Sequence, residues 1–339
     1  MRVRLKDIAK DLNLSKMTIS KVLRGQMDIS DETKARVLKR VKELNYIPNV
    51  SASSLRTGQT KIIGLVLPSL GARYSADLTS AISSTVDSQG YSLIVSVSDE
   101  DLDLEQKQIA VFLSLQVDAL LLVSLQEAAV FFEQLKTTKE VPVIFIASRP
   151  PGARGRFVGM HEEEVGRIAC EHLIDCGCKR IAYIRGPHSA IGDRRSNGYR
   201  QALRERGMPI QPGLVIESMS ADGSEFEYGY QAMEKLLNRR GRPDGVMTYS
   251  DLLAAGAMDA ATRHGLRIPE DVRFVGCGDD PLLCAMRVPL SSVNLSGREL
   301  GEGAGKLALR AIASRNRDGT RNLMVKPKLV KRRSSATSN

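Results

Sequence analysis

The sequence predicts an α/β protein with two doubly wound lobes, preceded by a small domain made only of helices. From residue 62 onward, short and continuous apolar runs alternate with helical patterns. Continuous apolar strands that alternate with helices are typical of parallel sheets covered on both faces. Nine such strands are too many for one small sheet, and 339 residues leave room for two or three domains.

The expected strands span 62–67, 92–97, 119–124, 141–147, 180–184, 214–218, 245–249, 273–277 and 291–295. The expected helices lie near 76–88, 103–115, 127–137, 162–176, 194–206, 226–239, 251–264 and 297–313. Open α/β sheets bind ligands at the carboxyl ends of their strands, so we expect a ligand crevice between two such lobes.

The stretch from Leu5 to Leu23 predicts two short helices around a tight turn. In the first helix, Ile8, Ala9 and Leu12 follow Leu5 at the spacing of one helical face. In the second helix Ser15 can act as the N-cap. The second apolar face consists of Ile19, Val22 and Leu23, which leaves Lys16, Met17, Thr18, Ser20 and Lys21 facing outward. Such a pair is typical of a helix-turn-helix that enters the DNA major groove, and an ordinary helical hairpin is the alternative.

A third helix is expected after the N-cap Ser30, with Pro48 ending it. Its inner face is expected to contain Val37, Val41 and Leu44, widened by Leu38. Residues 49–60 are small and polar, and a helix this short is not stable alone. They are therefore interpreted either as a flexible linker or as a hinge that becomes helical only when held against something.

The positive charge is concentrated in the helical domain. Residues 1–60 contain 13 Lys and Arg against 6 Asp and Glu, which gives +7 of the total formal charge of +10. This asymmetry favours a polyanionic partner. A second basic run at residues 331–333 opens a Ser-rich tail, which we expect to be frayed and solvated.

No part of the sequence predicts a membrane segment, a metal site or a cofactor. The N-terminus is charged, and no uninterrupted apolar stretch approaches the roughly 18 residues of a membrane span, so we expect a soluble, cytoplasmic protein. Cys176 and Cys178 are too close for a usual zinc pair, and nearby His172 completes no ligand set. The cysteines are interpreted as small buried hydrophobes.

An enzyme on a doubly wound fold is the alternative from another class. The sequence contains no dinucleotide-binding, P-loop, zinc-protease or nucleophile-elbow motif. His161, followed by three glutamates, is interpreted as the entrance of a helix with favourable acids rather than a catalytic site. We therefore expect no catalytic residues.

Over nearly its whole length the chain resembles the lactose-repressor (LacI/GalR) family of bacterial transcription regulators. The likeness rests on LKDIAKDLNLSKMTISKVL at 5–23, ELNYIPN at 43–49, the hinge ending in Leu55, and HGLRIPEDVRFVGCGDDP at 264–281. It implies a DNA-binding headpiece at 1–48, a hinge helix at 49–60, and a two-lobed periplasmic-binding-protein-like core at 61–339. The expected lobes are 61–160 with 291–323, and 161–290 with 324–330, followed by the tail at 331–339.

The resemblance also implies a homodimer on a palindromic double-stranded operator, since protein two-fold symmetry selects two-fold sites, while a tetramer stays open. A periplasmic receptor would share the core but has no use for a headpiece. Residues that match base-reading positions are Lys16, Met17 and Lys21. Residues that match backbone-contacting positions are Thr18, Ser20, Arg24, Tyr46 and Asn49. Ala52 and Leu55 match the minor-groove hinge, where Leu55 would wedge between two base pairs.

For the effector, the departures from the family are informative. Gly278 stands where sugar-binding relatives place an Asp, with Asp279 one residue further, and Ala147 replaces a second Asp. Positions matched to effector contacts are Arg73, Tyr74, Arg149, Arg195, Ser250 and Asp279. Lost carboxylates and retained guanidiniums suggest a sugar-like effector with negative charge, such as a sugar acid or a phosphorylated sugar. The alternative is that Arg73 and Arg149 merely face solvent or pair across the lobes.

Overall fold

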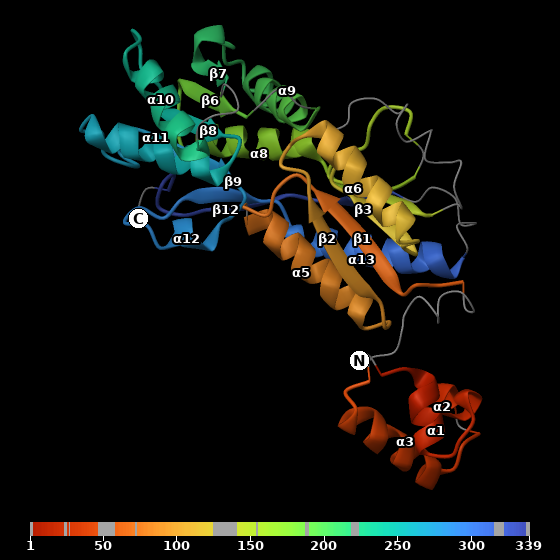
Figure 1. Cartoon of the computed structure of the whole chain (residues 1–339). Coiled ribbons are helices and arrows are strands. Elements are labelled where there is room, and N and C mark those ends of the chain that lie inside the picture. The colour runs from red at the N-terminus through yellow and green to blue at the C-terminus, as the bar shows by residue number, and fades with distance from the viewer. Residues whose placement is uncertain are drawn as a thin grey trace. The chain divides into compact units, whose positions relative to one another are not determined.

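Two units make up the chain, Met1–Thr60 and Lys61–Asn339. The computed structural model, drawn in Figure 1, describes residues 3–23, 26, 28–46, 58–71, 73–124, 141–153, 155–186, 190–217, 224–314 and 322–336.

The first unit is a three-helix domain with one small core. Its helices are α1 (Leu5–Asp11), α2 (Lys16–Leu23) and α3 (Asp31–Glu43). The core consists of the buried side chains Ile8, Ala9, Ile19, Val22 and Val37. These residues belong to the apolar faces that the periodicity predicts, so the helix-turn-helix prediction is confirmed at the level of fold.

Hydroxyl groups start two of these helices as expected. The Ser15 hydroxyl accepts a hydrogen bond from the Thr18 N–H at 3.0 Å, and Ser30 accepts from the Thr33 N–H. Leu38 was expected in the inner face of α3, but its side chain is 52% exposed, so that expectation is wrong. The helix also ends at Glu43, before Pro48, because Asn45 adopts a left-handed φ of 45°.

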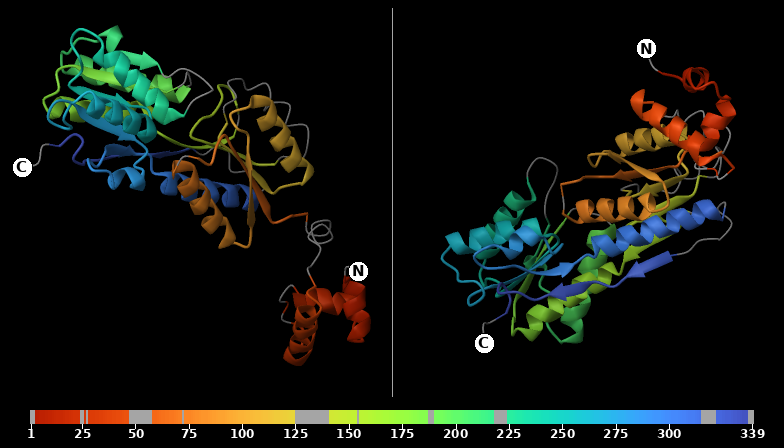
Figure 2. Two further views of the ribbon diagram at one scale, coloured as in Figure 1. Left: turned by 60° about the vertical axis from the view of Figure 1, so that its left-hand side comes forward. Right: turned by 90° about the horizontal axis from the view of Figure 1, so that it is seen from below.

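The first lobe of the second unit is a parallel six-stranded sheet. Its strands are β1 (Ile62–Leu67), β2 (Ser92–Val97), β3 (Ala119–Leu122), β4 (Val143–Ile146), β5 (Arg156–Met160) and β11 (Asn322–Val325), in the order β11-β5-β4-β3-β1-β2. Helices α5 (Arg73–Asp87) and α13 (Gly297–Ala313) cover one face, where they lie side by side in both views of Figure 2. Helix α6 (Leu102–Ser114) covers the other face, where the Phe112 ring packs on Gly64.

The second lobe repeats this plan. Its strands are β6 (Ile181–Arg185), β7 (Val215–Glu217), β8 (Gly245–Thr248), β9 (Arg273–Cys277), β10 (Ser291–Asn294) and β12 (Lys328–Val330), in the order β12-β10-β9-β8-β6-β7. Only the pairing of β10 with β12 is antiparallel. Helices α8 (Glu162–Asp175) and α9 (Ala190–Glu205) pack together, as do α10 (Glu225–Leu237) and α11 (Asp251–Arg263). A 3-10 turn at Pro212–Leu214 precedes β7, and a short helix, α12 (Pro281–Cys284), follows β9.

The nine expected strands are present, and three more were missed. The short strands β5, β11 and β12 contain arginine, lysine or asparagine, so they lack the continuous apolar run that marks the other strands. The expected helix near 127–137 lies outside the described residues.

The connections between the lobes also differ from expectation. Residues 291–294 were placed in the first lobe, but β10 pairs with β9 in the second sheet. The chain then returns to the first lobe in α13 and β11, and enters the second lobe again in β12. The expected crossing point between 323 and 324 falls inside β11, since Asn322 to Val325 all pair with β5.

The described part of the C-terminal tail, residues 331–336, is folded rather than frayed. Ser334 and Ser335 are completely buried. The Ser334 N–H donates to the Pro289 carbonyl, and the Phe274 N–H donates to the Ser334 carbonyl, both at 2.9 Å. The Ser335 hydroxyl lies 2.7 Å from the imidazole Nε2 of His172. The prediction of a solvated tail is therefore wrong, because small hydroxyl side chains satisfy buried polar groups at the edge of the second sheet.

Candidate nucleic-acid interface and ligand crevice

Helix α2 presents the side chains expected to read bases. Met17 is 62% exposed, Lys16 is exposed, and neither packs into the core of the headpiece. An exposed methionine between lysines on a helix of this kind can make an apolar contact, for example with a thymine methyl group.

Lys21 is half-buried, and its ammonium forms an ion pair with Asp28, in the turn before α3. This carboxylate is a partner that the sequence motifs did not reveal. The pair is largely solvent-exposed, so it contributes little to stability, and its effect is to hold the ammonium in place.

The residues expected to contact the DNA backbone are only partly described. The Thr18 hydroxyl lies 2.9 Å from the Ser15 hydroxyl, and Ser20 is half-buried on the same helix. Tyr46 packs against the headpiece core. Four expected contacts lie outside the described residues: Arg24, Asn49, Ala52 and Leu55.

In the second unit, Arg195 is the most deeply enclosed of the expected effector contacts. Helix α9 packs so closely on α8 that a Cβ at Gly166 would lie 2.0 Å from the Arg195 carbonyl oxygen. The guanidinium Nε donates to the Glu162 carboxylate at 2.7 Å, and Nη1 donates to the Tyr249 carbonyl at 2.9 Å. Its plane also lies against the Tyr249 ring, 4.7 Å from the centroid.

Tyr74 joins this cluster from helix α5 of the first lobe. Burial raises the pKa of its hydroxyl, and the charge of Glu162 raises it further, while Arg195 acts in the opposite direction. The pKa of Arg195 is also raised: burial favours the neutral form, but the charge of Glu162 outweighs it. Tyr74 and Arg195, far apart in sequence, therefore meet beside one buried carboxylate.

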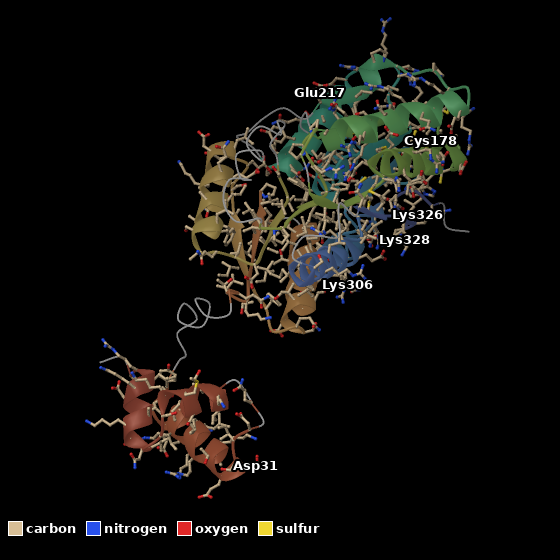
Figure 3. All side chains as sticks on the ribbon, turned by 90° about the vertical axis from the view of Figure 1, so that its right-hand side faces the viewer. Asp31, Cys178, Glu217, Lys306, Lys326 and Lys328 are labelled. Atoms are coloured by element: carbon tan, nitrogen blue, oxygen red, sulfur yellow. The ribbon has the colours of Figure 1, made fainter. Side chains whose placement is uncertain are left out.

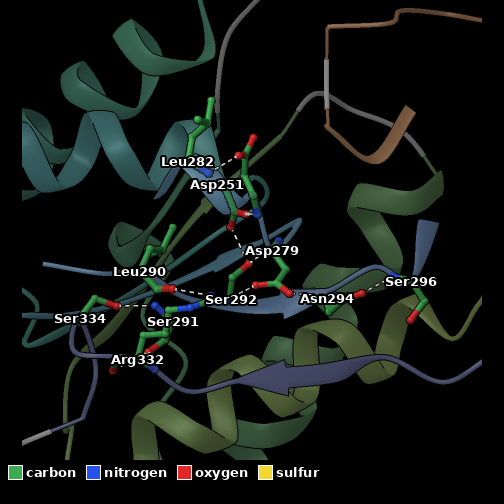
Figure 4. Close-up of polar contacts among 11 residues, drawn as sticks. Asp251, Asp279, Leu282, Leu290, Ser291, Ser292, Asn294, Ser296, Arg332 and Ser334 are labelled. Atoms are coloured by element: carbon green, nitrogen blue, oxygen red, sulfur yellow. Dashed lines mark hydrogen bonds and ion pairs between the residues drawn. The ribbon is translucent and has the colours of Figure 1, made fainter. Parts of the chain in front are cut away.

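Asp279 lies at the carboxyl end of β9, in a left-handed conformation with φ of 59°. Its carboxylate accepts hydrogen bonds from Arg332 Nη2 at 2.5 Å and from Asn294 Nδ2 at 2.8 Å (Figure 4). A pocket of about 340 Å³ has Tyr74, Asp279 and Asn294 in its wall. The structure thus brings Tyr74 and Asp279 together in the wall of one pocket.

Ser250 has a structural role that accounts for its hydroxyl. It is the N-cap of α11, accepting from the Leu253 N–H at 3.3 Å and donating to the Glu225 carboxylate at 2.6 Å. It follows β8, at the carboxyl edge where the expectation placed it.

The other two arginines are not part of this cluster. Arg73 is exposed and pairs with Asp77 one turn along its own helix, at 3.0 Å. Arg149 donates to the Gly155 carbonyl and to Asn322, and its guanidinium lies 5.5 Å from the centroid of the Phe157 ring. Those partners are at the beginnings of β5 and β11, so Arg149 lies away from the strand carboxyl ends, contrary to the expectation of an effector contact.

Three charged residues around the expected effector contacts were missed. Glu162 was interpreted as a helix-entrance acid, and because the strand before it, β5, was itself missed, no signal in the sequence marked Glu162 as following a strand. Arg332 belongs to the tail that was expected to be solvated. Arg185, at the end of β6, is buried and pairs with Asp193 and with Glu217 (labelled in Figure 3). None of the motifs in the sequence analysis includes an arginine at the end of a strand, so Arg185 was not singled out.

Asp251 is a buried carboxyl in the same part of the second lobe. It accepts hydrogen bonds from the Ser292 hydroxyl at 2.6 Å and from the Asp280 N–H at 2.8 Å (Figure 4). Burial raises the pKa of this carboxyl from 3.8 to about 6, against the lowering effect of those two donors.

The raised pKa predicts how stability depends on pH. The folded state binds this proton more tightly than the unfolded state, so the contribution is complete below about pH 4 and is lost as the pH rises through about 6. About two pK units correspond to roughly 3 kcal/mol. Relative to an Asp251→Asn variant, the unfolding free energy of the parent chain should fall across this window, as measured by urea denaturation at successive pH values. Parallel profiles for the two proteins would contradict the assignment.

Among the described residues, no group of His, Cys, Asp and Glu side chains could hold a metal ion. The cysteines Cys170, Cys178 and Cys277 are buried, and burial raises the pKa of each thiol to about 12. Cys176 is half-buried and lies 3.7 Å from His172 Nε2. In the part of the chain that the structure describes, no helix is both long and apolar enough to cross a membrane.

Comparison with protein families supports the division into two units. Residues 4–49 match the model of bacterial regulatory proteins of the lacI family, and residues 170–335 match a periplasmic-binding-protein-like domain. The HTH-type transcriptional repressor PurR of Yersinia pestis is 32% identical over 336 residues, covering 98% of this chain and 96% of PurR.

Two solved structures show the same architecture. The lac repressor dimer bound to operator and the anti-inducer ONPF is 26% identical, with a TM-score of 0.87, and covers 99% of this chain and 100% of that one. The complex of the transcriptional regulator CelR with cellobiose is also 26% identical, with a TM-score of 0.72, and covers 98% and 100%.

Proposed function

Because the chain belongs to the LacI/GalR family of transcription repressors and is not an enzyme, we propose that it binds a palindromic operator as a homodimer, under control of a small sugar-like effector. As a ligand-binding repressor of the LacI type it combines two sites, one in each unit. The observation that supports operator binding most directly is the exposed face of α2, where Lys16 and Met17 project from a basic domain.

The dimer is supported by apolar side chains that remain exposed on the second lobe. Phe226, Leu252 and Leu282 lie in the first turns of α10, α11 and α12, and Leu282 is 79% exposed. Helices α10 and α11 approach closely, since a Cβ at Gly256 would lie 1.9 Å from the Phe226 carbonyl oxygen. Figure 4 shows Leu282 beside Asp251, the residue before Leu252. We assign this surface, Phe226, Leu252 and Leu282, to contact with a second copy of the chain.

We place the effector at the strand carboxyl ends of the second unit, where Tyr74 and Asp279 line one pocket and the charge of the buried Arg195 acts on Tyr74. The sugar-like class is supported by the related CelR, which is seen with the uncharged sugar cellobiose. Effector binding is proposed to change the angle between the lobes, and with it the spacing of the two hinges around Ala52 and Leu55. Regulation is expected inside the cytoplasm, where operator DNA is found.

The operator is found by selecting bound duplexes from a random-sequence library with the full-length chain. The selected sites should be near-palindromic, and their affinity should fall steeply with salt, because each neutralised phosphate releases counterions. Lys21→Ala should lose about 1–3 kcal/mol of discrimination at its own base position. Met17→Ala is a control on the same helix that removes no charge. The operator affinity of this variant should therefore fall with salt concentration as steeply as that of the parent chain. A chain lacking residues 1–60 that still selects the same site would refute the proposal.

A further inference from the structure

Arg195, the expected effector contact, already has an anion beside it that the protein itself supplies. Glu162 and Arg195 form an ion pair at 2.7 Å, and each side chain is only 5% exposed. Glu162 is the first residue of α8 and Arg195 lies in the second turn of α9, and the glycines Gly166 and Gly198 allow the two helix backbones to touch. Close helix packing therefore holds the carboxylate and the guanidinium in a fixed geometry.

These contacts occupy the N–H donors of the Arg195 guanidinium that could otherwise bind an anion. A guanidinium binds a carboxylate or phosphate best through two parallel N–H donors. Here Nε already donates to Glu162, and Nη1 donates to the Tyr249 carbonyl. An anionic ligand could gain the Nε edge only by displacing Glu162, which would then remain as a buried carboxylate next to a second negative charge.

The neighbouring charges are balanced in the same way. Asp279 is neutralised by Arg332, and Arg185 by Asp193 and Glu217. Of the three arginines that the sequence suggested for an acidic effector, Arg195 pairs with Glu162 and Arg73 with Asp77, while Arg149 donates to the Gly155 carbonyl and to Asn322.

We propose that Glu162 is a specificity-determining residue, whose carboxylate fills the anion position at Arg195 and excludes anionic effectors from the crevice. This inference rests on the proposed function, since it assigns the crevice to an effector. It replaces the expectation of a sugar acid or phosphorylated sugar with an effector that carries no anionic group at Arg195.

Removing the carboxylate should open this position to inorganic phosphate, which serves as the probe. The thermal midpoint of the full-length chain is measured against phosphate concentration, with chloride at matched ionic strength as the reference. In Glu162→Gln the guanidinium is left uncompensated, so the apparent phosphate affinity should rise about tenfold or more over that of the parent chain, the size of a charge-assisted hydrogen bond.

Glu164→Gln is the matched control. It makes the same substitution on the same helix and removes the partner of Arg167, a side chain that is partly exposed. Phosphate should raise the thermal midpoint of this variant no more than it raises that of the parent chain. The parent chain provides the background, because phosphate can also bind its basic headpiece. Adding Arg195→Met to Glu162→Gln should abolish the gain.

Glu162→Asp is a second variant in case Glu162→Gln fails to fold. It keeps the negative charge but moves the carboxylate away from Arg195 by the length of one methylene group. It should show a smaller gain than Glu162→Gln. A parent chain that already binds phosphate through Arg195 would overturn the proposal, and so would the absence of any gain in both variants. Operator selection tests the proposed function independently of phosphate binding. If the Glu162→Gln chain gains phosphate binding but the parent chain selects no operator, the proposed function as a regulator is refuted while the role of Glu162 stands.

Discussion

Arg195→Ala should lower the unfolding free energy of the second unit by about 3–5 kcal/mol, the usual cost of leaving one charge of a buried pair without its partner. The Glu162 carboxylate would lose its Nε donor, and the Tyr249 carbonyl would lose its Nη1 donor. Urea denaturation followed by circular dichroism measures the change.

Arg167→Ala is a suitable comparison. Its guanidinium pairs with Glu164 and Glu171 on α8, but all three side chains are partly exposed, so water takes over much of the interaction. The expected loss is below about 1 kcal/mol. Replacing both charges, as in Glu162→Leu with Arg195→Met, should recover most of the stability lost in Arg195→Ala, because an apolar pair of similar size needs no charge partner. Equal losses for Arg195→Ala and Arg167→Ala would show that the buried pair is not a strong constraint.

Leu282→Glu should separate the dimer and weaken operator binding by about 100-fold or more, because two linked headpieces bind far more tightly than one. Leu282 is the most exposed large apolar side chain among the described residues. A carboxylate in its place would be buried without a partner at the contact between the two copies. Sedimentation velocity measures the oligomeric state, and a mobility-shift titration on the selected site measures the affinity.

Leu115→Glu provides the control for this substitution. Leu115 is also an exposed apolar residue, but it lies at the end of α6 in the first lobe. The variant should remain dimeric and keep its operator affinity. If Leu282→Glu also stays dimeric at micromolar concentration, the surface of Phe226, Leu252 and Leu282 is not the contact between copies.

The sequence by itself determined the elements whose patterns are local. The helix-turn-helix follows from apolar spacing and the caps Ser15 and Ser30, and both features are present in α1 to α3. The apolar strands β1 and β3 are buried as expected, because both faces of a parallel sheet are covered by helices, whereas β2, at the edge of the sheet, is only partly buried. The order of four motifs along the chain was enough to indicate the family.

Other features were decided only by tertiary structure. Strands β5, β11 and β12 are recognised only by their pairing with neighbours, since their sequences contain charged or small residues. The tail looked solvated because it is basic and rich in serine, yet Ser334 and Ser335 satisfy buried groups contributed by residues 43 to 163 positions away in the chain.

The ion pairs around Arg195 and Asp279 are the clearest case of a feature that the sequence alone could not predict. A resemblance to known regulators places Arg195 at the ligand, but it does not show which carboxylate faces it. Glu162 is 33 residues earlier in the chain, and Arg332, the partner of Asp279, is 53 residues later. Ion pairing depends on distances of a few ångströms between groups that local sequence does not bring together. The sequence therefore named the arginine, and only the packing of α8 on α9 decided that its anion is already present.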